Sequence, residues 1–119
     1  MPTRSIVFLL TLGLLTKSAP AQQAIVADSA ANHYVGRAVT VEGTVASMHV
    51  TRSGTTFLNF GAAYPNQTFT AVIFRSAASR FPNPQQWEGK RVRVTGGVRL
   101  YRGKPEIVLE ETSQLVLAP

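Results

Sequence analysis

The sequence contains no cysteine in its 119 residues. The chain therefore forms no disulfide, offers no thiolate nucleophile and has no cysteine to carry a lipid anchor. Its stability must come from an apolar core, and a domain of this length can bury enough apolar surface without covalent cross-links.

Acidic residues and histidines are also scarce, which argues against a catalytic or metal centre. Asp28 is the only aspartate, and His33 and His49 fall in different segments without the spacing of metal ligands. Glu106 and Glu110 share one face of an expected strand, where solvated charges on an edge strand are favoured over a weak cation site. We therefore expect a non-enzymatic protein with no catalytic residues, no metal and no cofactor.

A long apolar run occurs once, at Ile6–Leu15, with Arg4 before it and Ala19-Pro20-Ala21 after it. A positive end, a short apolar run and a small-residue site in this order are typical of a secretory signal peptide. The run is shorter than the ~20 residues of a finished membrane span. We expect cleavage after Ala21 and a periplasmic or secreted mature chain that is not attached to a membrane. An uncleaved N-terminal anchor is the alternative.

The chain has 12 basic and 6 acidic residues. Arg4 and Lys17 lie in the expected signal peptide, so the mature chain keeps a moderate excess of positive charge. This excess is smaller than that of many dedicated DNA-binding proteins.

The mature chain shows the two-residue period of β-strands. Val39, Val41 and Val45 share one face, while Thr40 and Glu42 share the other. The same reasoning predicts strands at 39–50, 55–60, 69–74, 91–100 and 106–110, and Leu115–Leu117 as a docking tail.

Short helical segments are expected at two places. Residues 22–27 are predicted to be a disordered leader, followed by a short helix that Asp28 caps and Gly36 ends. A helical turn is expected at Ser76–Phe81, and the prolines at 82 and 84 end it. Trp87, beside these prolines, is expected to plug the base of the fold.

Two segments of the chain repeat one pattern. Residues 36–45 read GRAVTVEGTV and residues 89–98 read GKRVRVTGGV. Two long strands with equivalent roles in one barrel explain the match, and Gly43 and Gly96 would then mark bulges where these strands bend. Two ordinary valine-rich strands are the alternative. Glu42 is expected to form a cross-strand ion pair with Arg91 or Arg93.

The order of three strands, a short helical segment and two strands is that of an OB-fold, an all-β five-stranded Greek-key barrel. We predict a signal peptide at 1–21, a leader and short helix at 22–35 and the barrel at 36–119. An SH3-like barrel is the main competitor, but it does not usually place a helical segment between its third and fourth strands.

The runs GRAVTVEGTV and EGKRVRVTGGVRLYRGKPEIVL resemble the first strand and last hairpin of bacterial OB-fold proteins. The run SGTTFLNFGAAYPNQTFTAVIF resembles OB-like segments of exported bacterial proteins described as nucleic-acid-binding. The resemblance covers roughly residues 30–114. It implies an OB-fold and suggests DNA-binding or RNA-binding, although OB-folds also bind oligosaccharides and proteins.

In an OB-fold, the loops between strands one and two and between strands four and five flank a binding face on strands two and three. The residues that this arrangement would gather are Arg52, Phe57, Asn59, Tyr64, Arg75, Arg99, Tyr101, Arg102 and Lys104. Positive charge with flat rings suits single-stranded nucleic acid, the predicted partner. A protein, a glycan or a small ligand is the alternative partner.

The pattern leaves open which face of strands two and three points inward. Leu58 and Phe60 share one face, and Phe57 and Asn59 share the other. A core position is therefore favoured over a stacking role for the phenylalanines at 57, 60, 69 and 74.

Overall fold

The computed structural model describes residues 23–119, and the expected signal peptide at 1–21 lies outside the described residues. The strands are β1 (Ile25–Ala27), β2 (Ala38–Val50), β3 (Thr56–Phe60), β4 (Phe69–Ile73), β5 (Arg91–Gly97), β6 (Arg99–Tyr101), β7 (Lys104–Val108) and β8 (Leu115–Leu117). The 3-10 helices are η1 (Asp28–Tyr34), η2 (Arg75–Arg80), η3 (Pro84–Trp87) and η4 (Thr112–Gln114).

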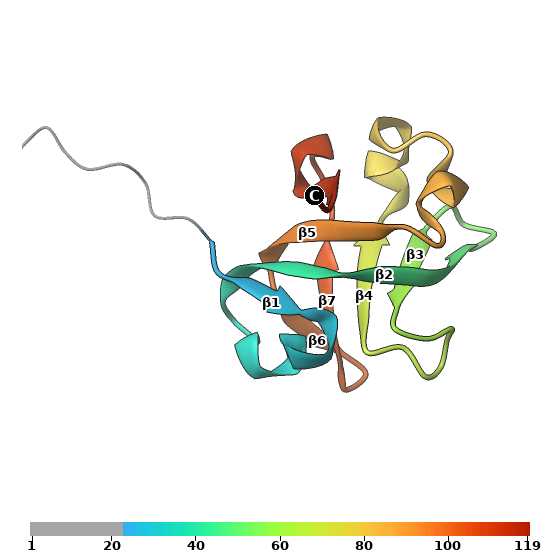
Figure 1. Cartoon of the computed structure of the whole chain (residues 1–119). Coiled ribbons are helices and arrows are strands. Elements are labelled where there is room, and N and C mark those ends of the chain that lie inside the picture. The colour runs from blue at the N-terminus through green and yellow to red at the C-terminus, as the bar shows by residue number, and fades with distance from the viewer. Residues whose placement is uncertain (1–22) are drawn as a thin grey trace, which may run out of the picture.

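The strands form one sheet in the order β6-β7-β4-β3-β2-β5-β8, with β1 added beside β2. The β1–β2 and β4–β7 pairs are parallel, and the other pairs are antiparallel. Figure 1 shows β1, β2 and β5 running across the front, with β7, β4 and β3 behind them at a steep angle. The predicted all-β class is confirmed.

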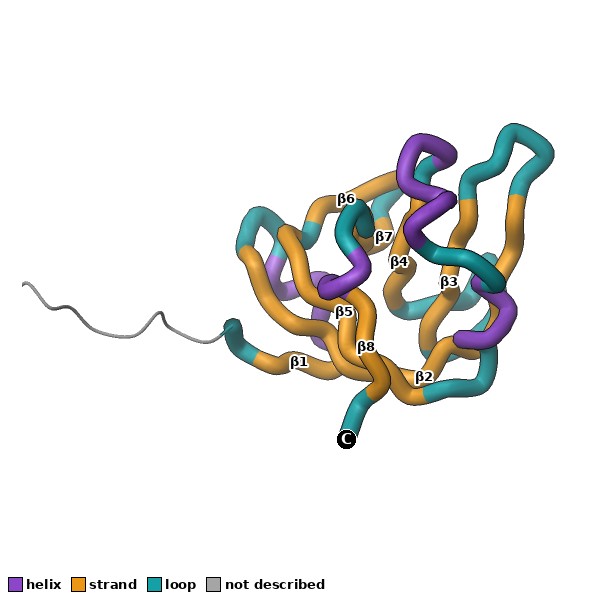
Figure 2. Tube along the Cα trace, turned by 90° about the horizontal axis from the view of Figure 1, so that it is seen from above, coloured by secondary structure: helices purple, strands orange, loops and turns teal. Residues whose placement is uncertain are grey.

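The sheet is open and has eight strands, so the exact five-stranded barrel that was predicted is not confirmed. The expected fourth strand is broken into β5 and β6, which are separated only by Val98. Val98 leaves the main ladder and bridges to Val35. Because β5 and β6 lie toward opposite ends of the strand order yet follow each other in the chain, the sheet curls back on itself, as Figure 2 shows.

The core lies inside this curl, and the valine pattern predicted much of it. Val39, Val41 and Val45 are fully buried, as are Val92 and Val94 on β5. Phe60 and Phe69 meet edge to face in the core, with ring centroids 5.1 Å apart. Leu100, expected on the same face as the β5 valines, is 53% exposed because the strand breaks at Val98.

The segment expected to be a disordered leader is ordered over Ile25–Ala27, where it forms β1 along β2. Its alternation places Val26 in the core. The short helix after it is confirmed as η1, but Asp28 does not cap it. The carboxylate of Asp28 instead accepts a hydrogen bond from the Thr68 hydroxyl, which ties η1 to the β3–β4 loop.

The two pattern glycines lie at close approaches between elements, which corrects the prediction of bulges. A Cβ on Gly43 would lie 2.7 Å from Asp28 Oδ1, and one on Gly96 would lie 2.6 Å from Ile107 Cγ2. The irregularity of β2 falls instead between Val45 and Ser47.

The 3-10 helices η2 and η3 fill the connection between β4 and β5, at the upper right of Figure 1. The helical turn expected at 76–81 corresponds to η2, but η3 was not expected, because Pro84 was predicted to end a helical segment. Ala77 and Phe81 are buried there, and Trp87 packs against the core. Pro84 begins η3, where its missing N–H costs nothing. No helix in residues 23–119 is long and apolar enough to cross a membrane.

The fifth strand of the pattern, β7, begins at Lys104, two residues before the predicted start. Arg102 and Gly103 both have positive φ, so the turn is only two residues long and Lys104 already pairs with Tyr101. A two-residue turn of this kind matches the twist of a hairpin.

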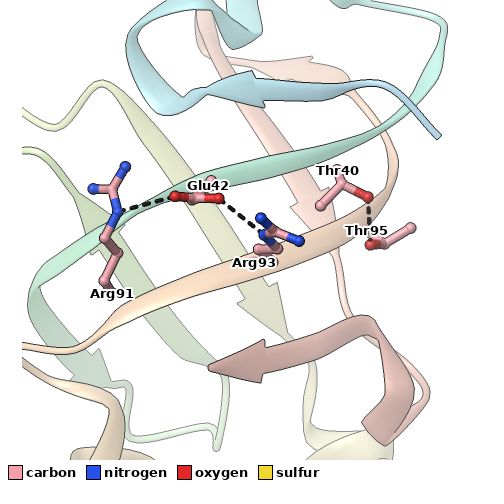
Figure 3. A network of polar contacts seen from close by, with 5 residues as sticks. All are labelled: Thr40, Glu42, Arg91, Arg93 and Thr95. Atoms are coloured by element: carbon pink, nitrogen blue, oxygen red, sulfur yellow. Dashed lines mark hydrogen bonds and ion pairs between the residues drawn. The ribbon is translucent and has the colours of Figure 1, made fainter. Parts of the chain in front are cut away.

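The outer polar network, drawn in Figure 3, joins β2 to β5 on the solvent side. Glu42 accepts hydrogen bonds from Arg93 Nε at 2.9 Å and Arg91 Nε at 3.0 Å, so the predicted ion pair is confirmed with both arginines. The hydroxyls of Thr40 and Thr95 meet at 2.8 Å. The Arg93 hydrogen bond, helped by Arg91, holds the pKa of the Glu42 carboxyl below its ordinary value against the opposing effect of desolvation.

Candidate nucleic-acid interface

The register of β3 and β4 settles which face points inward. Leu58 pairs with Ala71 and Phe60 with Phe69, and all four side chains are buried in the core. Because side chains alternate along a strand, Phe57 and Asn59 point to the opposite face. This outer face of β3 and β4 is the face predicted to bind.

A row of polar residues crosses this outer face. The register aligns Ser47 with Asn59, Asn59 with Thr70, Thr70 with Glu106 and Glu106 with Arg99. These five residues, here called the groove row, come from β2, β3, β4, β7 and β6 in turn. They therefore line up across the sheet although they span more than half of the described sequence.

Hydrogen bonds link much of the groove row. Asn59 Nδ2 donates to Ser47 Oγ at 3.3 Å, and the Thr70 hydroxyl donates to Asn59 Oδ1 at 3.4 Å. Arg99 Nε donates to Glu106 Oε2 at 2.7 Å. Asn59, Thr70 and Glu106 are 3%, 6% and 5% exposed, so the row forms a polar floor beneath the surface.

A cavity of about 670 Å³ lies above this floor. It is lined by Ser47, His49, Phe57, Asn59, Ala63, Tyr64, Pro65, Gln67, Thr70, Tyr101, Arg102, Lys104, Pro105 and Glu106. The size falls in the range of ligand sites in proteins, ~300–1,000 Å³. We call this cavity the groove.

Three aromatic residues line the groove. Phe57 is half-buried on β3, while Tyr64 in the β3–β4 loop and Tyr101 at the end of β6 are 72% and 52% exposed. The structure thus brings together the three aromatic residues predicted for the site. Of the four phenylalanines given a core position, Phe60 and Phe69 are buried, whereas Phe57 is half-buried and lines the groove, and Phe74 is 42% exposed outside it.

Two of the predicted phosphate-binding cations already have partners inside the protein. Arg99 is paired with Glu106, and its guanidinium lies 5.9 Å from the centre of the Phe74 ring. Lys104 Nζ donates to the backbone oxygens of Pro65 at 2.8 Å and Gln67 at 2.9 Å. Their charges are therefore partly committed to holding the walls of the groove.

The other predicted cations lie at different distances from the groove. Arg102 lines it and lies over the Tyr101 ring, 5.2 Å from its centre. Arg52 is exposed in the β2–β3 turn, and Arg75 begins η2 with its side chain packed beside Gly54. The groove thus gathers Phe57, Asn59, Tyr64, Tyr101, Arg102 and Lys104, whereas Arg52, Arg75 and Arg99 do not line it.

Glu106 corrects the sequence analysis most directly. It was expected as a solvated charge on an edge strand, but β7 lies between β6 and β4, and Glu106 is buried against Arg99. Glu110, its expected neighbour on the strand, is exposed beyond the end of β7. Within residues 23–119 no three His, Cys, Asp or Glu side chains gather as a metal site.

Sequence reasoning also missed Ser47, Gln67 and Thr70. Ser47 and Thr70 carry a signal, because each occupies a polar position on the face shared with Asn59. Gln67 lies in a loop without periodicity, and its burial depends on the packing of the β6–β7 hairpin against the β3–β4 loop, through Lys104.

No protein-family model matches this sequence, and no curated protein matches it significantly. Solved structures resemble it in shape. An asparaginyl-tRNA synthetase from Entamoeba histolytica is 18% identical over 85% of this chain with a TM-score of 0.55, and its complex with asparaginyl-adenylate gives 0.53. A protein described as an aspartyl-tRNA synthetase from Leishmania major Friedlin is 8% identical over 98% of this chain, with a TM-score of 0.51.

The matched domains of these synthetases are OB-folds. The fold is of the OB type. This OB module spans about a quarter of the synthetase chains, 25% and 27% of their lengths. At these identities the likeness concerns the fold alone.

Proposed function

We propose that this protein is a non-enzymatic OB module that binds single-stranded nucleic acid in the groove. The observation that carries the proposal is the combination of a buried polar floor with exposed rings at Tyr64 and Tyr101. Flat rings stack on bases of any sequence, while amides and hydroxyls bind base edges. Arg102 at the rim supplies a charge for the phosphate backbone.

The internal partners of Arg99 and Lys104 set the expected salt dependence. With Arg52 and Arg102 as the two cations that contact phosphates, the slope of log affinity against log salt should be about −1.4, at ~0.7 per contact on a single strand. A slope of this size indicates that contacts to bases contribute more than contacts to phosphates.

A glycan is the second candidate ligand, and the commitment of Arg99 and Lys104 inside the protein favours it. The groove then offers a floor of amides and hydroxyls with aromatic walls, which suits an uncharged, hydroxyl-rich ligand. Glycan binding would show almost no salt dependence, so the slope distinguishes the two candidates.

Fluorescence anisotropy of the purified protein with labelled single-stranded DNA, RNA and duplex DNA at several salt concentrations tests the proposal. Arg102→Ala should flatten the slope by ~0.7. Arg37→Ala is the matched control, because Arg37 lies over the Tyr34 ring at 5.0 Å but does not line the groove. A folded protein that binds no single strand at low salt would refute nucleic-acid binding.

We also propose that the protein is exported and cleaved after Ala21, on the strength of the Ala19-Pro20-Ala21 signal. Intact-mass measurement of the protein from the exported fraction should give a chain that begins at Gln22. A product that retains residues 1–21 would contradict this proposal.

A further inference from the structure

Gln67 is a buried polar residue without a complete set of partners. It is 8% exposed, it lines the groove, and its Oε1 accepts no hydrogen bond within the described residues. Its Nε2 makes only a long contact of 3.5 Å to the Thr70 hydroxyl. A buried acceptor without a partner is costly to a free protein, and such groups often mark a site that a ligand completes.

Glu106 offers a second acceptor to the same groove. Its Oε2 accepts from Arg99 Nε, and the residue lines the groove. Neither a carboxylate nor an amide oxygen can donate. Lys104 holds the backbone oxygen of Gln67 at 2.9 Å, which fixes the position of this residue in the loop. The groove therefore presents two acceptors that a ligand with N–H groups would satisfy.

We propose that this part of the groove is a subsite for one guanine base, which donates N1–H and N2–H to Gln67 Oε1 and the Glu106 carboxylate. This inference rests on the proposed function. Among the common bases, guanine is the one whose pairing edge carries two neighbouring N–H donors. Cytosine and adenine present one amino group beside an acceptor, and thymine and uracil present a single N–H between two oxygens.

The walls of the groove suit a flat ring above this floor. Tyr64 and Tyr101 are exposed rings, and both line the same cavity as Gln67 and Glu106. Stacking on these tyrosines would hold any base, while the two acceptors would distinguish guanine from the others.

Oligonucleotides with a single change test the subsite. Fluorescence anisotropy would compare a labelled ten-residue oligothymidine with the same strand carrying one central guanine, adenine, cytosine or hypoxanthine. The guanine strand should bind roughly 5- to 100-fold more tightly than oligothymidine, the range of a good two-point base contact. Hypoxanthine keeps N1–H but lacks the 2-amino group, so it should lose a large part of this preference.

Two variants test the role of Gln67. Gln67→Met keeps the length of the side chain but removes its acceptor, so it should abolish the guanine preference over oligothymidine. Gln85→Met on η3, exposed and outside the groove, is the matched control and should keep the preference. The hypoxanthine comparison needs no variant and remains valid if Gln67→Met folds poorly.

Two failures are distinguishable. Measurable binding with equal affinity for all five strands would overturn the guanine subsite and leave the proposed function intact. Absence of binding to every strand would overturn both.

Discussion

The outer polar network and the groove row are both lines of polar side chains across neighbouring strands, but their surroundings differ. In the outer polar network Glu42 has two arginine partners and Thr40 has the hydroxyl of Thr95. Beside the groove row, Gln67 keeps a buried acceptor oxygen without a partner among residues 23–119.

Under the proposed function, this difference separates polar contacts that hold the fold together from polar groups that a ligand would complete. Polar groups on a solvated face cost little and find partners within the protein. An acceptor kept under the surface without a partner lowers the stability of the free protein, and the proposed guanine subsite would supply the missing donor.

The largest effect expected at the groove is on binding. Tyr101→Ala should weaken single-strand binding by ~1–3 kcal/mol and leave the salt slope unchanged, because stacking releases no counterions. Anisotropy titrations at several salt concentrations measure both quantities. Leu100→Ala is the matched control, since Leu100 is equally exposed but lies outside the groove. If Tyr101→Ala and Leu100→Ala lose the same binding affinity, the groove is not the binding surface.

The seam between β5 and β7 gives the second prediction. β5 carries the outer polar network on one side and Gly96 on the other, and a Cβ on Gly96 would lie 2.6 Å from Ile107 Cγ2. Gly96→Val should therefore cost about 1–3 kcal/mol of unfolding free energy through overpacking. Denaturant unfolding measures this cost.

Gly97 provides the matched control for this prediction. A Cβ on Gly97 would meet nothing within 4 Å, so Gly97→Val should leave the stability nearly unchanged. If both variants unfold at the parent's midpoint, the contact between β5 and β7 is looser than described.

A smaller effect on stability is expected when a polar group that has a hydrogen-bond partner, Thr40, is compared with one that lacks a partner, Gln67. Thr40→Val leaves the Thr95 hydroxyl without its 2.8 Å partner and should cost about 1 kcal/mol. Gln67→Met, in the absence of ligand, should leave the melting temperature unchanged or raised, because it removes a buried acceptor that has no partner. Thermal unfolding followed by circular dichroism measures both, and a lower melting temperature for Gln67→Met would assign Gln67 a structural role.

The smallest effect is the pH dependence of the outer polar network. The pKa of Glu42 is lower in the folded protein than its unfolded value of about 4.3, so its contribution is present above that pH and is lost as the pH falls through the folded pKa. The difference in melting temperature between the parent and Glu42→Gln should therefore be constant from about pH 5 to 7 and shrink below about pH 4.

The exposed Glu110 serves as the control for this titration, through Glu110→Gln. If the difference in melting temperature between the parent and Glu42→Gln is undiminished at about pH 3, the arginines do not stabilise the charged form of Glu42.

The two-residue period of apolar residues predicted the strands well, because a strand with one buried face must place an apolar residue at every second position. The valines of β2 and β5 and the ion pair of Glu42 followed from alternation alone. Alternation could not show that Val98 would leave the ladder or that Ile25–Ala27 would pair in parallel with β2, because these depend on contacts distant in sequence.

The sequence predicted only part of the candidate site. Aromatic and basic residues at the expected loops indicated Tyr64, Tyr101 and Arg102. Composition could not tell a free cation from a committed one, so the internal partners of Arg99 and Lys104 appeared only in the structure.

The ammonium of Lys104 has a consequence for the thermodynamics of binding. It has three N–H donors, and the backbone oxygens of Pro65 and Gln67 occupy two of them. The loop that carries Tyr64 is thus held against the hairpin that carries Tyr101 before any ligand arrives. The loop and the hairpin therefore lose little conformational entropy when a ligand binds, and the free and ligand-bound structures should superpose closely.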